Sequence, residues 1–493
     1  MGLLWTLLGT GSQLFLQLIA VLILARILTP RDFGVVAAAL VVVGFSSTFS
    51  RLGVGPAVVQ RPTLTDRHLT TGFTLSILSG VLMGAAIYAA APLIAEFFII
   101  PELIPVIQVL AFKFILEAAS VMPESLLQRE LMFKRLSMVE LIAFAVGFAG
   151  VGIALALAGF GLWALTLAYM GQALVKAIIL IVIRPHPMRP TLHFDAMKDL
   201  LYFGGGFTAA RIGNYIGVQG DKMVIGRWLG AEPLGVYGRA YQLMVAPAND
   251  LGAVMDNVLF PAMALVQGSK ERLRIAFRRG IAGVALLMLP LGIVCYVLAP
   301  EIIDLLLGPK WVAVVEPFRY FALGLLFRTS YKMSDSISRA TGSEYRRAWR
   351  QWVYAILVTG GAYFGSTWGL SGAAFAMLIA TGLNYLLMAH LSLSVASMSW
   401  REFFIAQTPA MILTAIVGAV TWGVERYLRA SGFPGIEILF LTILADLVAA
   451  LALVRFLPWL VLGEDGLWML RTIAGFLPDR GNPLVWLLRE DRT

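Results

Sequence analysis

The chain has little of what most enzymes and soluble proteins depend on. Its 493 residues include one cysteine, Cys295, and four histidines, and only 14% of the residues are charged. A single cysteine excludes an internal disulfide and a cysteine-based metal site. The glycine patterns of nucleotide-binding loops are absent, as is a Ser-His-Asp arrangement near any probable pocket. The sequence therefore predicts neither an enzyme nor a bound cofactor or metal.

Apolar residues, in contrast, make up 59% of the chain. Runs of about 20 such residues recur from end to end, and each is long enough to cross the hydrocarbon core as a helix. No segment alternates in the way that membrane strands require. We predict an all-α, multi-pass membrane protein with about fourteen transmembrane helices. The predicted spans lie near residues 3–28, 33–52, 70–98, 102–126, 136–159, 161–183, 200–229, 233–262, 276–307, 311–338, 348–366, 369–394, 403–427 and 434–461.

The net charge of +9 is distributed unevenly along the chain. Alternate loops carry most of the lysines and arginines, as in residues 270–279 and 339–350. The positive-inside rule makes these loops cytoplasmic, and an even number of spans then places both termini in the cytoplasm as well. The basic charge is thus an orientation signal with some attraction to anionic membrane lipids, and we expect no nucleic-acid partner.

A short pattern occurs twice at an offset of 201 residues. Arg26-x-Leu28-x5-Gly34-Val35 recurs as Arg227-x-Leu229-x5-Gly235-Val236. Both copies lie where a long apolar segment ends and the next begins. Repeated halves in a membrane protein are typical of transporters whose site lies between them. For Arg26 and Arg227 we favour a structural role, because a cation suits the C-terminus of a helix.

The repeat extends into the following spans. Ala91-Pro92 matches Ala299-Pro300 at an offset of 208, and beyond an insertion the offset becomes 211, which pairs Ala111 with Ala322. At about 100° per residue, each half then presents a charged stripe on one helix face. The first stripe is mainly acidic and the second mainly basic, and Arg319 points away from the second. The stripes consist of Lys113, Glu117 and Glu124, and of Arg328, Lys332 and Asp335.

Charged residues at membrane depth usually face a bundle interior or a watery cavity. Such residues also occur in the predicted seventh span, as Arg211, Asp221 and Lys222, and in the eighth, as Asp250 beside a proline. Two simpler interpretations stay open. Residues three or four apart, such as Lys113 and Glu117, can neutralise each other within one helix. Side chains near a helix end, such as Lys332, can extend to the membrane surface.

Several short stretches stand out along the chain: Ala25–Gly34 (ARILTPRDFG), Val58–Arg61 (VVQR), Leu126–Glu130 (LLQRE) followed by Phe133–Arg135 (FKR), Asp221–Arg227 (DKMVIGR) and Leu259–Ala262 (LFPA). Together they resemble the polysaccharide transporter branch of the oligosaccharide flippases, which belong to the multidrug/oligosaccharidyl-lipid/polysaccharide exporter superfamily. The resemblance covers about residues 3–460 with matching segment order.

The resemblance implies two six-helix lobes in a V-shaped bundle, with two peripheral spans. It also implies movement of an undecaprenyl-diphosphate-linked oligosaccharide across the bacterial inner membrane for O-antigen, capsule or exopolysaccharide synthesis. Glycan polymerase machinery is then a possible partner. We accordingly predict four segments: an N-terminal lobe (1–193), a C-terminal lobe (194–397), peripheral spans (398–461) and a cytoplasmic amphipathic tail (462–493).

Related flippases have a cationic cavity. By their positions in the predicted spans, the residues that would line such a cavity here are Arg211, Lys222, Arg328 and Lys332, with Lys113 and Arg319 as further candidates. Cationic side chains would replace the hydration of a lipid diphosphate during alternating access.

No nucleotide site is present, so a H⁺ or Na⁺ gradient is the expected energy source. The candidate coupling carboxylates are Glu117, Asp221, Asp250, Glu124 and Asp335. The alternatives are a multidrug exporter of the same superfamily, which the acidic stripe would suit, and a membrane scaffold, which has no need of membrane-depth charges.

Overall fold

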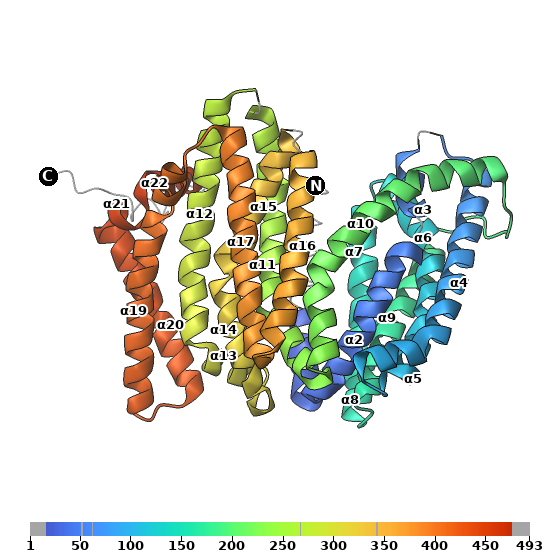
Figure 1. Cartoon of the computed structure of the whole chain (residues 1–493), viewed down its shortest axis with the longest axis horizontal. Helices are drawn as coiled ribbons and strands as arrows, with labels where there is room; N and C mark the ends of the chain where they lie inside the picture. The colour runs from blue at the N-terminus through green and yellow to red at the C-terminus, as the bar shows by residue number, and fades with distance from the viewer. Residues whose placement is uncertain (1–15, 51–52, 62, 267, 342–343, 476–493) are drawn as a thin grey trace. The chain divides into compact units, whose positions relative to one another are not determined.

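The computed structural model of the chain describes residues 16–50, 53–61, 63–266, 268–341 and 344–475. Some side chains within these ranges, among them those of residues 199–214 and 249–262, lie outside the description. The described residues form helices joined by short connections and contain no strand (Figure 1). The prediction of an all-α protein is confirmed for this part of the chain.

Contacts between residues divide the chain into a first unit, residues 1–238, and a second unit, residues 239–493. The boundary falls inside α11 because α10 packs against α2, α3 and α4 of the first unit. The boundary predicted at residue 193 follows the sequence repeat instead, and those four segments stay a prediction. After a helix over Leu16–Ile27, the first unit contains α2 (Pro30–Ser50), α3 (Val54–Gln60), α4 (Asp66–Phe98), α5 (Leu103–Ala111), α6 (Lys113–Arg129), α7 (Phe133–Ile142), the π-helix η1 (Ala143–Gly150), α8 (Val151–Leu157), α9 (Leu162–Ile183), α10 (Phe194–Trp228) and the start of α11 (Ala231–Val266).

The second unit continues along α11, and two short helices follow its last long helix within the described residues. Its last long helices, α19 and α20, pack against each other and against α12 and α13 respectively. The helices are α12 (Lys270–Val297), α13 (Ala299–Leu306), the 3₁₀ helix η2 (Pro309–Val314), α14 (Val315–Leu323), α15 (Leu325–Ala340), α16 (Glu344–Ser366), α17 (Gly369–Ala396), α18 (Trp400–Ile405), α19 (Thr408–Ala430), α20 (Gly435–Phe456), α21 (Pro458–Val461) and α22 (Gly463–Gly475).

Nine segments within the described residues are long and apolar enough to cross a membrane, and the helix over Leu16–Ile27 is apolar but shorter. Helices such as α10 are long enough, but glycines and charged residues interrupt their apolar character. The multi-pass architecture is therefore established, whereas the count of about fourteen spans stays a prediction.

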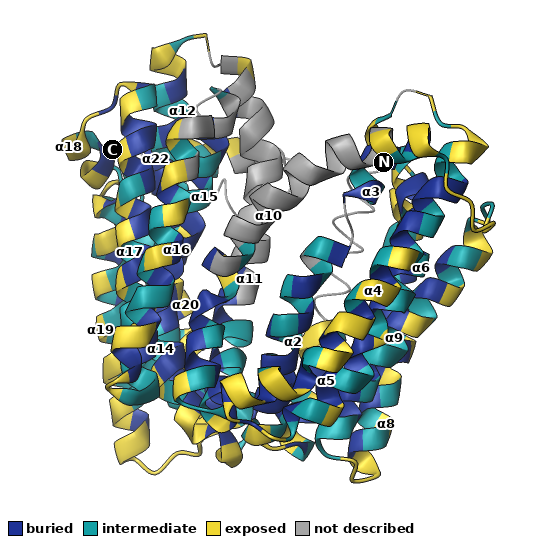
Figure 2. Cartoon of the chain, turned by 45° about the vertical axis from the view of Figure 1, so that its right-hand side comes forward, coloured by how far each residue is buried: buried dark blue, intermediate teal, exposed yellow. Residues whose placement is uncertain are grey.

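The two faces of α4 differ in burial and in the size of their side chains. One face is buried through small residues, among them Gly80, Gly84 and Ala91, while Leu82 and Leu93 are 62% and 69% exposed. Buried and exposed segments alternate along α4 in Figure 2. Large apolar side chains are costly to expose to water but not to lipid. This face of α4 is therefore suited to contact the membrane.

Two helix contacts confirm the register of the predicted repeat. A Cβ atom on Gly84 would meet the carbonyl of Ala111, and a Cβ atom on Gly292 would meet the carbonyl of Ala322. The glycines differ by 208 and the alanines by 211 residues, which are the two offsets found in the sequence. Each alanine lies near the break of a predicted span, between α5 and α6 and between α14 and α15. The halves are thus built alike at these positions.

Candidate functional site

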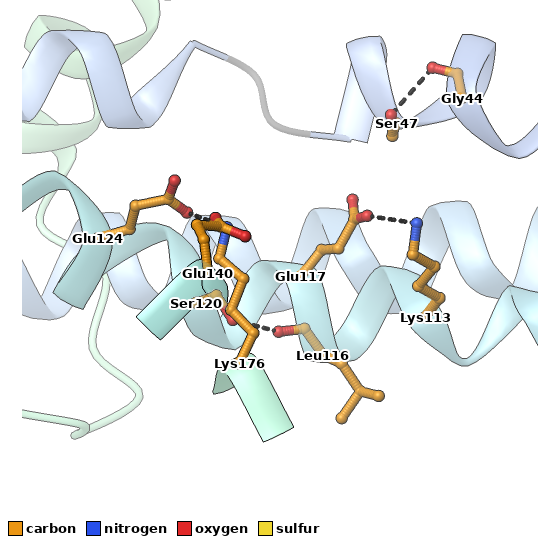
Figure 3. Close-up of polar contacts among 9 residues, drawn as sticks. All are labelled: Gly44, Ser47, Lys113, Leu116, Glu117, Ser120, Glu124, Glu140 and Lys176. Atoms are coloured by element: carbon orange, nitrogen blue, oxygen red, sulfur yellow. Dashed lines mark hydrogen bonds and ion pairs between the residues drawn. The ribbon is translucent and has the colours of Figure 1, made fainter. Parts of the chain in front are cut away.

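Five charged side chains meet in a cavity of about 210 Å³ inside the first unit (Figure 3). Lys113, Glu117 and Glu124 come from α6, Glu140 from α7 and Lys176 from α9. Their side chains are between 19% and 33% exposed. We call this group the charged cavity, and it contains the whole first-half stripe predicted from the sequence.

Lysine–carboxylate pairs organise the charged cavity. The Lys113 ammonium lies 3.0 Å from a Glu117 oxygen, so the intrahelical pair considered from the sequence is present. Lys176 bridges two other helices, with its ammonium 3.2 Å from Glu124 and 2.5 Å from Glu140. Two lysines thus face three glutamates, which leaves one surplus negative charge when all five groups are ionised.

A close helix contact brings Glu140 and Lys176 together. A Cβ atom on Gly147, in the π-helix η1 that follows α7, would clash with the backbone of Gly171 and Gln172 in α9. Glycine at this crossing lets the two backbones approach more closely than side chains would allow. The charges of α7 and α9 can then pair across the gap, and π-helical segments frequently occur beside functional sites.

The remaining lining of the charged cavity is mostly polar. Besides the charged side chains, it consists of Ser120, Tyr169 and Gln172, with the apolar Val121 and Ala173. Carboxylates accept hydrogen bonds, ammonium groups donate them, and amide and hydroxyl groups do both. This mixture suits a ligand that is itself both donor and acceptor, such as a sugar.

Asp221 forms a second, separate buried group in the first unit. It is 0% exposed, and its carboxylate accepts hydrogen bonds from the Tyr237 hydroxyl at 2.7 Å and from the backbone amide of Lys222 at 2.8 Å. Tyr237 is also fully buried. In the first half of the repeat the equivalent positions, 201 residues earlier, are the apolar Ala20 and Val36. The polar pair is therefore specific to the second copy.

In the second unit, Arg328 is the most deeply buried of the predicted basic residues that the structure describes, at 7% exposure. Its guanidinium carbon lies 5.5 Å from the centre of the Tyr241 ring and 6.0 Å from that of Phe321. Aromatic faces stabilise a cation in this arrangement. On the same helix, Asp335 is ion-paired with Arg347.

The other predicted site residues have different surroundings. Lys332 and Lys222 are partly exposed, and Arg319 contacts Glu316 at 2.9 Å and the Tyr296 carbonyl at 3.2 Å. The side chains of Arg211 and Asp250 lie outside the described residues. The roles assigned to all these residues stay predictions.

The two repeat arginines end helices, as expected. Arg26 is exposed at the end of the helix over Leu16–Ile27. Arg227 lies in the last turn of α10, with its guanidinium within 6 Å of the Phe97 and Trp228 rings. These surroundings agree with a structural role and do not test it.

Glu140 and Lys176 were not among the residues that we assigned to a site from the sequence. The signal for them was present, because a tight turn around Phe160 joins their two spans. Glu140 lies 20 residues before that position and Lys176 lies 16 residues after it. Two opposite charges at similar depth in adjacent helices are expected to pair.

Comparison with known proteins places these features in context. A family model described as polysaccharide biosynthesis protein matches residues 23–316. The lipopolysaccharide biosynthesis protein WzxC of Escherichia coli is 26% identical, over 85% of this chain and 87% of its own length. The teichuronic acid biosynthesis protein TuaB of Bacillus subtilis is 28% identical, over 85% and 88%. The succinoglycan biosynthesis transport protein ExoT of Rhizobium meliloti is 25% identical, over 73% of each chain.

Solved structures show a shared fold at lower sequence identity. The lipid II flippase MurJ, in an inward closed conformation, superposes with a TM-score of 0.74 at 14% identity, covering 91% of this chain and 97% of its own. An inward-facing multidrug transporter of the MATE family, in the MOP superfamily, superposes with a TM-score of 0.60 at 16% identity, covering 78% and 94%. The fold is thus one that membrane transporters use.

Proposed function

The chain belongs to the polysaccharide biosynthesis protein family, and on that premise we propose that it is a flippase for lipid-linked oligosaccharides. The substrate would be an undecaprenyl-diphosphate-linked glycan destined for a surface polysaccharide. The names of its relatives, which refer to lipopolysaccharide, teichuronic acid and succinoglycan, support this assignment. The fold that it shares with a lipid II flippase supports it as well.

The observation that carries the proposal is the set of charged side chains inside an otherwise apolar helical protein. A glycan and a diphosphate cannot enter hydrocarbon without groups that replace their hydration. The charged cavity offers donors and acceptors for sugar hydroxyls. Arg328, held beside two aromatic rings, offers a cation for the diphosphate. The polyprenyl tail would remain in lipid while the protein alternates between two states.

Reconstituted transport tests this function. Purified protein in lipid vesicles is expected to move a fluorescent undecaprenyl-diphosphate oligosaccharide between leaflets, measured as loss of fluorescence to a membrane-impermeant quencher. Protein-free vesicles and vesicles with a cationic dye as cargo are the controls. Efflux of the dye with no movement of the lipid-linked glycan would instead support the multidrug exporter, which the surplus negative charge of the charged cavity favours.

A H⁺ or Na⁺ gradient would reset the carrier, and we propose Asp221 as the coupling carboxylate. Among the described candidates, Glu117, Glu124 and Asp335 each have a lysine or arginine partner. Asp221 instead receives its hydrogen bonds from a hydroxyl and an amide. Binding of a proton or a sodium ion at this carboxylate during the cycle would couple the gradient to transport.

An uncoupled variant tests the role of Asp221. Asp221→Asn keeps the size of the side chain and one acceptor for the Lys222 amide, while its NH₂ group can donate to a reoriented Tyr237 hydroxyl. We therefore expect flipping to continue but to lose its acceleration by a proton or sodium gradient. Flipping rates with and without each imposed gradient measure this. Glu117→Gln is the comparison variant. Loss of the gradient effect in Glu117→Gln alone would move the coupling role to the charged cavity.

We also propose an inner-membrane location with both termini in the cytoplasm. The loops rich in lysine and arginine support this orientation. Reporter fusions at Gly268 and Phe433 are expected to give cytoplasmic and periplasmic signals respectively, because the two residues lie in connections on opposite predicted sides of the membrane. The reverse pattern would contradict the orientation.

Glycan polymerase machinery on the outer side is the partner that would consume the flipped product. Failure to co-purify with it in mild detergent would count against a stable complex.

A further inference from the structure

The backbones of α2 and α11 touch near the start of each helix. A Cβ atom on Gly34 would collide with the carbonyl of Ala231, and a Cβ atom on Gly235 would collide with the carbonyl of Pro30. Pro30 and Ala231 are the first residues of the two helices. Helices that pack through ordinary side chains keep their axes about 8–10 Å apart. We call this contact the glycine crossing, since a larger residue at either position would force the helices apart.

The glycine crossing has the symmetry of the sequence repeat. At the repeat offset of 201 residues, Ala231 is the equivalent of Pro30, and Gly235 is the equivalent of Gly34. The glycine of each copy lies against a backbone carbonyl of the other copy, and that carbonyl belongs to the residue four positions before the other copy's glycine. Such reciprocity is the mark of a contact through which a two-fold axis passes. The two copies of the motif therefore meet each other at a local two-fold axis.

Polar contacts brace both helix starts around the glycine crossing. Arg31 reaches Glu102, before α5, at 2.5 Å, and so ties α2 to the connection after α4. On the other side, the buried hydrogen bond between Asp221 and Tyr237 joins α10 to α11. The first contact fixes the start of α2 to the connection after α4, and the second fixes α11 to α10, which itself packs against α2. At the glycine crossing, backbone atoms of α2 and α11 make the close approach.

We propose that the glycine crossing is the pivot on which α2 and α11 rotate against each other during transport. Gly34 and Gly235 are then positioning residues for the proposed flipping reaction, on which this inference rests. A contact on a two-fold axis keeps its separation when the angle between the helices changes, whereas interlocked side chains off the axis must separate. Because α11 runs on past Gly238 into residues 239–266, rotation at this point would be transmitted along that helix.

Alanine at either glycine tests the need for close approach. Gly34→Ala and Gly235→Ala are each expected to lower the initial rate of flipping at least about tenfold, because the added methyl group meets backbone that no rotamer change can relieve. Gly238→Ala is the matched control on the same helix, since a Cβ atom there meets nothing within 4 Å. All variants are compared at equal amounts of folded protein in vesicles. Wild-type rates in both crossing variants would overturn the proposal.

Cross-linking distinguishes between two hypotheses: a contact that acts as a pivot, and a contact that opens during transport. Pro30→Cys and Ala231→Cys, in a Cys295→Ser background, are joined with a short bifunctional thiol reagent that can be cleaved by reduction. A pivot predicts that cross-linked protein still flips at more than about half the rate of the reduced protein. Flipping that stops on cross-linking and returns on reduction would overturn the pivot. An inactive wild-type protein would instead count against the flippase function itself.

Discussion

Replacing Lys176 with methionine is expected to abolish flipping and to lower the stability of the first unit. Lys176 is the cation that joins α6, α7 and α9 through Glu124 and Glu140. Without it, two partly buried carboxylates face each other, and the surplus charge of the cavity rises from one to two. Breaking such a pair costs about 2–3 kcal/mol after allowance for partial exposure. Thermal unfolding in detergent and vesicle flipping measure the two effects.

Two further variants distinguish a structural role of Lys176 from a role in transport. Lys176→Arg keeps the charge and is expected to retain most of the stability. Adding Glu140→Gln to Lys176→Met removes both charges of the shorter pair, and we expect the double variant to regain stability but not flipping. Recovery of both properties would show that the charged cavity only holds the helices together, and its assignment to glycan binding would then be withdrawn.

Much of the fold followed from patterns that are local in the sequence. Apolar runs define helices because each must cross the same thickness of hydrocarbon. The repeat register was also accessible, and the matching contacts of Gly84 and Gly292 confirm it. The breaks between α5 and α6 and between α14 and α15 were not predicted, because hydropathy continues across both. Helix direction there depends on packing with α4 and α12.

The charged cavity was predictable only in part. The stripe of Lys113, Glu117 and Glu124 follows from helical periodicity, which acts within one segment. Lys176 belongs to another helix, and pairing it with Glu124 required knowledge of which helices are neighbours. The glycine crossing shows the same limit. The motif around Gly34 and Gly235 marks a repeat, but sequence alone does not reveal that the two copies touch.

Arg328 is the residue whose loss is expected to weaken substrate recognition most. Its guanidinium lies beside the Tyr241 and Phe321 rings, which restrict the side chain and lower the entropy cost of ligand binding. Charge-assisted hydrogen bonds to a phosphate contribute about 1.5–3 kcal/mol each. Two such bonds from one guanidinium amount to about 3 kcal/mol or more, which corresponds to roughly a 100-fold change.

We therefore expect Arg328→Ala to reduce both the affinity for a lipid diphosphate and the flipping rate by roughly 100-fold. Arg328→Lys keeps the charge but loses the planar, two-point geometry, so its rates should fall between those of the alanine variant and the wild type. Arg426→Ala, at an exposed arginine on α19, is the control for removal of a cation.

Binding to nanodiscs separates recognition from folding, because lipid diphosphate and lipid monophosphate can be compared on the same protein. Arg328→Ala should lose the preference for the diphosphate if the guanidinium binds it at two points. An alanine variant that keeps this preference and flips at the wild-type rate would remove Arg328 from substrate binding. A variant that loses affinity for both lipids equally, with a lowered unfolding temperature, would give Arg328 a packing role against Tyr241 and Phe321 instead.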